Sequence, residues 1–153
     1  MAVLKSMKFR NERRGSVLVE TALVFPILLL LTLGLLEYGW MFIKVQQIGL
    51  AAREGVRVGA RADGTSALCN TAVDVAMTNG HMQSSGYTIT RTPDNLGSAA
   101  AGSTIKVKVQ VNYSNIKLIP GLSTFLPKPS TLQGEFSMMK EGIINTSGGG
   151  SGP

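Results

Sequence analysis

Residues 14–40 read RGSVLVETALVFPILLLLTLGLLEYGW and form a long apolar segment near the start of the chain. The part from Val17 to Leu36 has about 20 residues, which at about 1.5 Å per residue matches the roughly 30 Å hydrocarbon core of a bilayer. It runs on into bulky residues without the small-residue cleavage site that follows a secretory signal. The segment therefore predicts a retained transmembrane helix.

A basic cluster precedes this segment and accounts for part of the formal net charge of +6 of the 153-residue chain. A basic balance can indicate a nucleic-acid partner. Next to a membrane segment, however, excess Lys and Arg mark the cytoplasmic side. We therefore predict a cytoplasmic N-terminus, an extracytoplasmic domain after Tyr38 and no nucleic-acid partner. The cluster comprises Lys5, Lys8, Arg10, Arg13 and Arg14.

The titratable residues outside the membrane segment do not form an evident catalytic or metal-binding group. Cys69 is the single cysteine, which excludes an intramolecular disulfide, and we expect it to be a small buried residue. His81 is the single histidine and lies in a segment rich in Gly, Asn and Ser, which predicts a solvated side chain. The acids are scattered without metal-ligand spacing. We therefore predict no enzymatic activity, no catalytic residues, no metal and no cofactor.

Three residues of the membrane segment predict features of its helix. Ser16 can serve as the N-cap, and Glu20 then lies near the positive end of the helix dipole, which favours an anion. Pro26 removes a backbone donor and predicts a kink. A charged side chain at the bilayer centre costs on the order of 2.5–3.5 kcal/mol, so Glu20 needs either a partner or access to water near the inner leaflet. Both alternatives stay open.

The helix is expected to continue beyond the membrane to Ala62 and to end at Asp63-Gly64. An apolar face follows the spacing of three or four residues and contains Val45, Ile48, Ala52, Val56 and Gly59. Arg53, Arg57 and Arg61 repeat every four residues and make either a solvated basic face or a partner-binding face. Glu54 is spaced to pair with Arg57.

The rest of the chain predicts a second short helix and about three strands. Thr65 or Ser66 can cap a helix over 66–78, whose expected apolar face is Leu68, Ala72, Val75 and Ala76. Strands are expected over 87–92, 104–113 and 131–140, with Ile105, Val107, Val109, Val111 and Tyr113 on one buried face and Leu132 and Phe136 in the core. The expected fold class is α+β and pilin-like, a small antiparallel sheet packed on the amphipathic half of the long helix.

An irregular apolar loop separates the last two strands, over 116–129. Its apolar side chains could pack on the membrane surface, on a neighbouring subunit or over the core of their own domain, and we favour the core. They are Leu118, Ile119, Leu122, Phe125 and Leu126. Residues 142–153 are rich in Gly and Ser and predict a flexible tail.

The motifs around the membrane segment resemble those of a known family. After Arg14, Gly15 is followed by four residues, then Glu20 and an apolar helix, which is similar to the processing site of type IV prepilins. The stretches RGSVLVETALVFPILLLL and GLLEYGW, with the later QQ and AAREGVR, resemble the TadE-like family of pseudopilins of tight-adherence (Flp-type) pili. Thr21 departs from this pattern, since the family usually has an aromatic residue there.

The resemblance implies a function and a set of site residues. A prepilin peptidase would cut between Gly15 and Ser16, and Glu20 would pair with the new N-terminal amine of its own or a neighbouring subunit. The implied protein is a minor pilin or pseudopilin in the bacterial inner membrane that joins other pilin subunits and pilus assembly proteins in surface adhesion. The alternative is an uncleaved single-pass scaffold of an envelope or secretion complex.

These expectations divide the chain into a leader (1–15), a transmembrane helix (16–38), an extracytoplasmic α+β domain (39–141) and the tail (142–153). Glu37, Tyr38 and Trp40 are expected at the membrane–water interface, where amphipathic rings gather.

Overall fold

The computed structural model describes residues 12–122 and 127–142, with side chains from Gly15 onward. The order of elements is α1 (Glu12–Gly59), α2 (Ser66–Asn79), β1 (Tyr87–Thr92), β2 (Thr104–Asn112), the short 3-10 helix η1 (Tyr113–Asn115) and β3 (Thr131–Met139). The predicted α+β class is confirmed. Most of the leader, Phe125, Leu126 and residues 143–153 of the tail lie outside the described residues.

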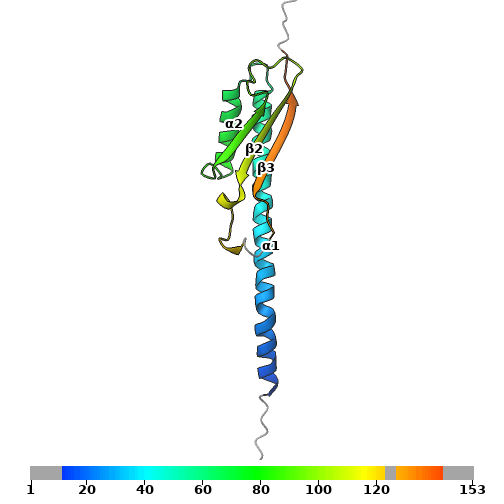
Figure 1. Cartoon of the computed structure of the whole chain (residues 1–153), viewed down its shortest axis with the longest axis vertical. Helices are drawn as coiled ribbons and strands as arrows, with labels where there is room; N and C mark the ends of the chain where they lie inside the picture. Colours follow the sequence, from blue (N-terminus) through cyan, green and yellow to red (C-terminus); the bar gives the residue numbers. More distant parts are fainter. Residues whose placement is uncertain (1–11, 123–126, 143–153) are drawn as a thin grey trace, which may run out of the picture.

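Helix α1 has 48 residues, and its two halves differ in their surroundings. The N-terminal half, which includes residues 17–31, is called the bare half because its side chains are exposed, and the C-terminal half, which includes residues 48–56, is called the covered half. Figure 1 shows the blue, N-terminal part protruding alone, while α2 and the sheet surround the cyan part. The bare half carries large apolar side chains that are 42–74% exposed between Val17 and Leu31. One face of the covered half enters the core through Ile48, Ala51, Ala52 and Val56, each 0% exposed.

The three strands form an antiparallel sheet in the order β1-β2-β3, with β2 in the centre. Ile89 pairs with Val109, and Val107 pairs with Phe136 across the sheet. Side chains alternate along β2, so that Ile105, Val107, Val109 and Val111 are buried. This confirms the predicted alternation, in which one face packs on helix and the other meets solvent.

Two glycines bring β3 and α1 into direct backbone contact. A Cβ atom added at Gly134 of β3 would lie 2.7 Å from the Cα atom and 2.8 Å from the backbone nitrogen of Gly49 in α1. No real Cβ atom tolerates such contacts with backbone. The close approach lets Phe136 pack against the core and puts its ring 4.9 Å below the guanidinium of Arg53.

The predicted buried face of α2 is wrong for Leu68 and Val75, whereas Ala76 does pack against the core. Cys69, Val73 and Met77 are buried, whereas Leu68 is 46% and Val75 55% exposed. Apolar residues occur almost all around this helix, so the sequence pattern did not distinguish the faces. Two glycines of α1 determine which face of α2 packs against α1. A Cβ at Gly55 would meet Val73 Cγ2 at 2.5 Å, and one at Gly59 would meet Cys69 Cβ at 3.5 Å.

Other details of α2 agree with the sequence. The Thr65 side chain accepts a hydrogen bond from the backbone N–H of Leu68, which confirms it as the N-cap. Cys69 is buried as predicted, and this burial raises the pKa of its thiol. In the loop after β1, Leu96 enters the core at 0% exposed, which the sequence analysis missed because it stands alone among polar residues.

The predicted ends of α1 are also wrong. The helix begins at Glu12, so Ser16 is an interior residue and not the N-cap; Glu12, Arg13 and Arg14 favour helix, and Gly15 costs only about 1 kcal/mol there. It ends at Gly59, before Asp63-Gly64.

A cation just beyond β3 accounts for this early end. Lys140 is buried, and its Nζ donates to the backbone oxygens of Gly59 at 3.2 Å and Gly64 at 2.8 Å. A positive charge at a helix C-terminus is favourable, and the two bonds hold the chain in a turn after Gly59.

Pro26 lies inside α1, which continues past it as one helix. The blue part of α1 shows no sharp bend in the view of Figure 1, so the predicted kink is not seen in this view. The proline still leaves the backbone oxygen of Ala22 without its usual helical donor.

The contact between Gly134 and Gly49 predicts opposite effects for two matched substitutions. Gly134→Ala forces β3 away from α1 and should lower the free energy of unfolding by about 1–3 kcal/mol. Gly49→Ala adds a Cβ that meets only Phe136 Cε2, at an ordinary 3.7 Å, so helix propensity should raise stability by up to about 1 kcal/mol. Thermal unfolding of the purified chain measures both, and equal losses would contradict the packing described.

Candidate assembly site and helix junction

The predicted processing residues lie in the first turns of α1. Gly15 and Ser16 are exposed and helical, and a Cβ added at Gly15 would meet nothing within 4 Å. Nothing in the described part of the chain therefore blocks access to the peptide bond between them. Its helical conformation must unwind before a peptidase can bind it in extended form.

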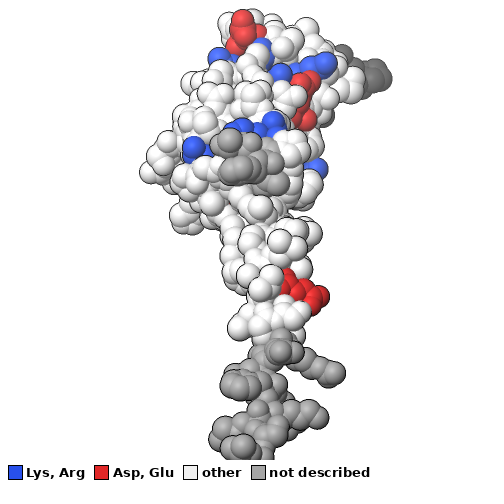
Figure 2. Space-filling view, turned by 60° about the horizontal axis from the view of Figure 1, so that its bottom comes forward, with Lys and Arg blue, Asp and Glu red and all other residues white. Residues whose placement is uncertain are grey.

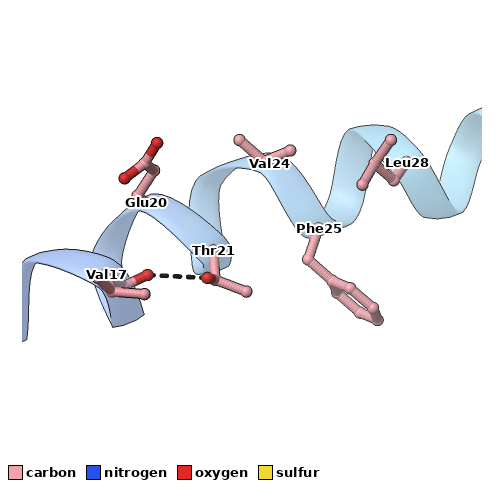
Figure 3. Close-up of a pocket in the computed structure, with 6 residues that line it drawn as sticks. All are labelled: Val17, Glu20, Thr21, Val24, Phe25 and Leu28. Carbon is pink, nitrogen blue, oxygen red and sulfur yellow. Dashed lines mark hydrogen bonds between the residues drawn. The ribbon is translucent and has the colours of Figure 1, made fainter. Parts of the chain in front are cut away.

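Glu20 lies on the bare half of α1, one turn beyond Ser16. It shares a shallow hollow with Val17, Thr21, Val24, Phe25 and Leu28. In Figure 3, Glu20, Val24 and Leu28 project from one side of the helix and Phe25 from the other. The Thr21 hydroxyl donates a hydrogen bond to the Val17 backbone oxygen at 2.8 Å, so its donor has a partner within the helix.

From Gly15 onward, where side chains are described, the carboxylate of Glu20 is isolated from other charges. It is the one Asp, Glu, Lys or Arg between Gly15 and Leu36. Figure 2 shows the narrow protruding part as uncharged apart from one acidic spot. Neither of the ion pairs found among the described residues involves Glu20. An exposed acid within an apolar surface is a site where a cationic group of another molecule, or of a new chain terminus, can pair.

The second group of predicted residues forms a junction between α1 and the segment that follows β2. Glu37 is only 4% exposed. Its carboxylate accepts hydrogen bonds from the backbone N–H of Leu118 at 3.3 Å, from that of Ile119 at 2.9 Å, and from the Tyr113 hydroxyl. The sequence pattern predicts this acid at the membrane–water interface and indicates no bonding partner for it.

Tyr38 and Trp40 complete the junction. The Tyr38 hydroxyl donates to the Pro127 backbone oxygen at 2.6 Å, and Trp40 Nε1 donates to that of Ile116 at 2.8 Å. Both rings can still lie at the membrane surface, but their polar atoms hold Ile116 and Pro127 against α1. Of the apolar side chains expected over the core, Leu122 is buried, Ile119 is half-buried and Leu118 is 44% exposed, while Ile116, which was not among them, is also buried.

The predicted arginine stripe is not a uniform surface. Arg57 pairs with Glu54 at 2.8 Å, as the spacing predicted, and Arg61 pairs with Asp63 at 3.3 Å. Arg53 instead lies over the Phe136 ring. All three side chains are exposed, but each has an intramolecular partner, so their role as a partner-binding face stays a prediction.

Comparison with known proteins bears on α1. Residues 15–57 match the family model described as TadE-like protein. The match confirms the resemblance indicated by the sequence motifs, and it includes the bare half of α1, the junction residues and the arginines up to Arg57. No curated protein and no solved structure matches the chain.

The TadE-like segment lies wholly within α1, so α2 and the sheet fall outside the match. The match also agrees with α1 being long and apolar enough to cross a membrane, with a mean hydropathy of 2.3 in its most apolar window.

Substitution of Glu37 tests the junction. In Glu37→Gln the new amide nitrogen faces a backbone donor, which leaves a buried N–H without its acceptor at a cost of about 1–3 kcal/mol. Thermal unfolding should show this loss. Glu135→Gln, which removes an exposed carboxylate from β3, should stay within about 0.5 kcal/mol of the unsubstituted chain. Equal stability of the two variants would contradict the role given to Glu37.

Alkaline pH should weaken the junction through Tyr113. Burial, and next the hydrogen bond to Glu37, raise the pKa of its hydroxyl well above the ordinary 10.0. Above pH 10 the unfolded chain loses a proton that the folded chain keeps, so stability falls as pH rises. Tyr113→Phe should remove this part of the dependence in denaturant unfolding measured across alkaline pH.

Tyr87→Phe is the control substitution for the loss of stability at alkaline pH that is assigned to Tyr113. Burial and the hydrogen bond to Asp74 raise the pKa of Tyr87 to about 12, away from the junction. Each single substitution should reduce the alkaline loss, and the double substitution should reduce it further. An unchanged loss in Tyr113→Phe would contradict the assignment.

Proposed function

We propose that the chain is a pilin-like subunit of the Tad pilus, a minor pilin or pseudopilin, that is cut between Gly15 and Ser16 by a prepilin peptidase. The observation that carries the proposal is the bare half of α1, an apolar helix interrupted by one isolated acid. The protein acts through this helix rather than by catalysis. After processing it primes or joins the pilus and contributes to surface adhesion.

The bare half of α1 has too much apolar surface to stay in water. Its exposed side chains include Leu23 at 74% and Leu18 at 69%. Contiguous apolar surface of this extent marks membrane or protein contact. In the membrane it is covered by lipid, and in a filament by the equivalent helices of neighbouring subunits.

Orientation and domain boundaries follow from the same helix. The basic leader holds the N-terminus in the cytoplasm, residues 16–38 cross the inner membrane, and residues 39–141 lie outside. Residues 142–153 form a tail. The peptidase and the pilus assembly proteins then reach the chain from the membrane.

Processing suits the residues at the start of α1. Glycine is a poor helix former, so unwinding the first turns at Gly15 is less costly than elsewhere in the helix. Its lack of a side chain lets the extended backbone approach the catalytic groups of a peptidase closely. The cut leaves Ser16 with a free ammonium group, four residues before Glu20.

The new amine gives Glu20 a partner. A carboxylate and an ammonium in contact offset part of the cost of holding each charge in an apolar environment. The amine can belong to the same subunit or to a neighbour. Pairing between neighbours would fix the register of stacked helices.

The alternative is an uncleaved single-pass scaffold of an envelope or secretion complex. The continuation of α1 through Gly15 favours it, because a helical peptide bond is not ready for cleavage. In that case Glu20 stays near the inner leaflet and reaches water without a partner.

The mature N-terminus tests the proposal. Intact-mass analysis of the chain extracted from membranes should give a chain that starts at Ser16. Gly15→Val should leave the leader attached, whereas Gly39→Val should be cut normally, because a Cβ at Gly39 also meets nothing within 4 Å. A chain that keeps its leader without any substitution would favour the scaffold.

Glu20→Gln tests the pairing separately from the cut. The variant should still be cut by the peptidase. Its recovery in sheared pili should fall by at least about tenfold, because each pairing of Glu20 with an N-terminal amine that is lost costs about 1.4 kcal/mol. Glu135→Gln removes an exposed acid from the domain and should assemble normally. Normal assembly of Glu20→Gln would contradict the pairing.

A further inference from the structure

A polar cavity of about 220 Å³ lies at the base of the domain, directly above the junction. Its lining includes Trp40, Lys44, His81, Ser84, Asn115 and Lys117. Two lysines and a histidine face this cavity, and no carboxylate lines it. The lining therefore favours a negatively charged ligand.

Lys44 is the unusual member of this lining, because it is a buried cation without an anion. It is 6% exposed. Its Nζ donates to Gln47 Oε1 at 3.0 Å and to the Gly80 backbone oxygen at 3.3 Å, and lies 4.6 Å from the centroid of the Trp40 ring. Neither ion pair among the described residues includes it.

Burying a charge is costly unless an opposite charge accompanies it. Loss of hydration lowers the pKa of Lys44, which is the sign of a cation whose neighbours do not replace the water. The nearest acid along α1 on this side is Glu37, whose carboxylate already accepts three hydrogen bonds. One N–H of the Lys44 ammonium stays available to a ligand.

Some of the other polar side chains that line the cavity already make hydrogen bonds within the protein, and the rest are available to a ligand. Asn115 Nδ2 donates to the Ser85 backbone oxygen at 2.8 Å, and Ser85 Oγ donates to that of Met82 at 2.6 Å. These bonds shape the wall of the cavity. The side chains of His81, Ser84 and Lys117 are exposed and free to meet a ligand that enters from outside.

The depth of the cavity matches that of lipid phosphates. Side chains on a helix lean toward its N-terminus, and Lys44 Nζ accordingly lies over Trp40, four residues or about 6 Å beyond Leu36. The polar headgroup layer of a bilayer extends about 5–8 Å beyond the hydrocarbon core. With the hydrocarbon ending near Leu36, the cavity opens at this layer.

We propose that this cavity binds the phosphate group of an anionic phospholipid on the outer side of the inner membrane. The inference rests on the proposed membrane anchoring of α1. Lys44 and Lys117 supply the positive charge, and Ser84 and His81 supply hydrogen bonds. The bound headgroup fixes the height and rotation of the domain above the bilayer before assembly.

Trp40 is the single tryptophan of the chain and lines the cavity, so its fluorescence reports on binding. The full chain in a non-ionic maltoside detergent is titrated with short-chain phosphatidylglycerol, with the matching phosphatidylcholine and with inorganic phosphate. Phosphatidylglycerol should give a saturable change, and the other two should give none in the same range.

Lys117→Gln should raise the half-saturating concentration of phosphatidylglycerol about fivefold, the effect of one lysine near an anionic surface. Lys106→Gln removes the same charge from the solvent face of β2 and should leave it unchanged. An equal response to phosphatidylcholine or to inorganic phosphate would overturn the lipid site. So would equal weakening by both substitutions, which indicates general surface charge.

The titration does not depend on leader cleavage, so the two proposals can fail separately. A chain that keeps its leader but binds phosphatidylglycerol contradicts only the pilin assignment. A chain cut after Gly15 that shows no response to phosphatidylglycerol contradicts only the lipid site.

Discussion

The structure depends on helix α1, one half of which packs inside the domain while the other half has an exposed apolar surface. The covered half of α1 supplies the central wall of a small domain, where small residues such as Gly49, Ala52 and Gly55 let β3 and α2 approach closely. The bare half has apolar side chains that no other element among the described residues covers. The exposed apolar surface of that half is therefore removed from water only when lipid or other helices surround it.

The change between the two environments occurs at Glu37. Up to Thr32 every described side chain of the helix is exposed, Gly34 and Glu37 are its first buried residues, and after Glu37 the side chains of Trp40 and Lys44 contact the domain. Three hydrogen bonds to its buried carboxylate hold the chain after β2 against α1. An acid at this point therefore sets where the domain begins, while Glu20, about 25 Å away along the helix, is left for contact with another group.

Much of this architecture could be predicted from the sequence, because the signals are local. The alternation of Ile105 to Val111 fixed the central strand, and the apolar spacing of Ile48, Ala52 and Val56 fixed the covered face of α1. The predicted buried face of α2 was wrong for Leu68 and Val75, since apolar residues surround that helix and Gly55 and Gly59 of α1 determine which of them pack against it. The roles of Glu37, Lys44 and Lys140 were missed because each has a hydrogen-bond partner that is 36 to 82 residues away in the chain. A buried charge is recognised only when those partners are brought to it.

The division of α1 is tested most directly by two leucines with nearly the same exposure, Leu28 at 56% and Leu50 at 58%. Each is replaced by cysteine in a Cys69→Ala chain, labelled with a nitroxide and reconstituted in lipid vesicles. The label at position 28 should collide mainly with oxygen dissolved in the bilayer, and the label at position 50 mainly with a water-soluble nickel complex. Equal access of the nickel complex to both positions would contradict the account.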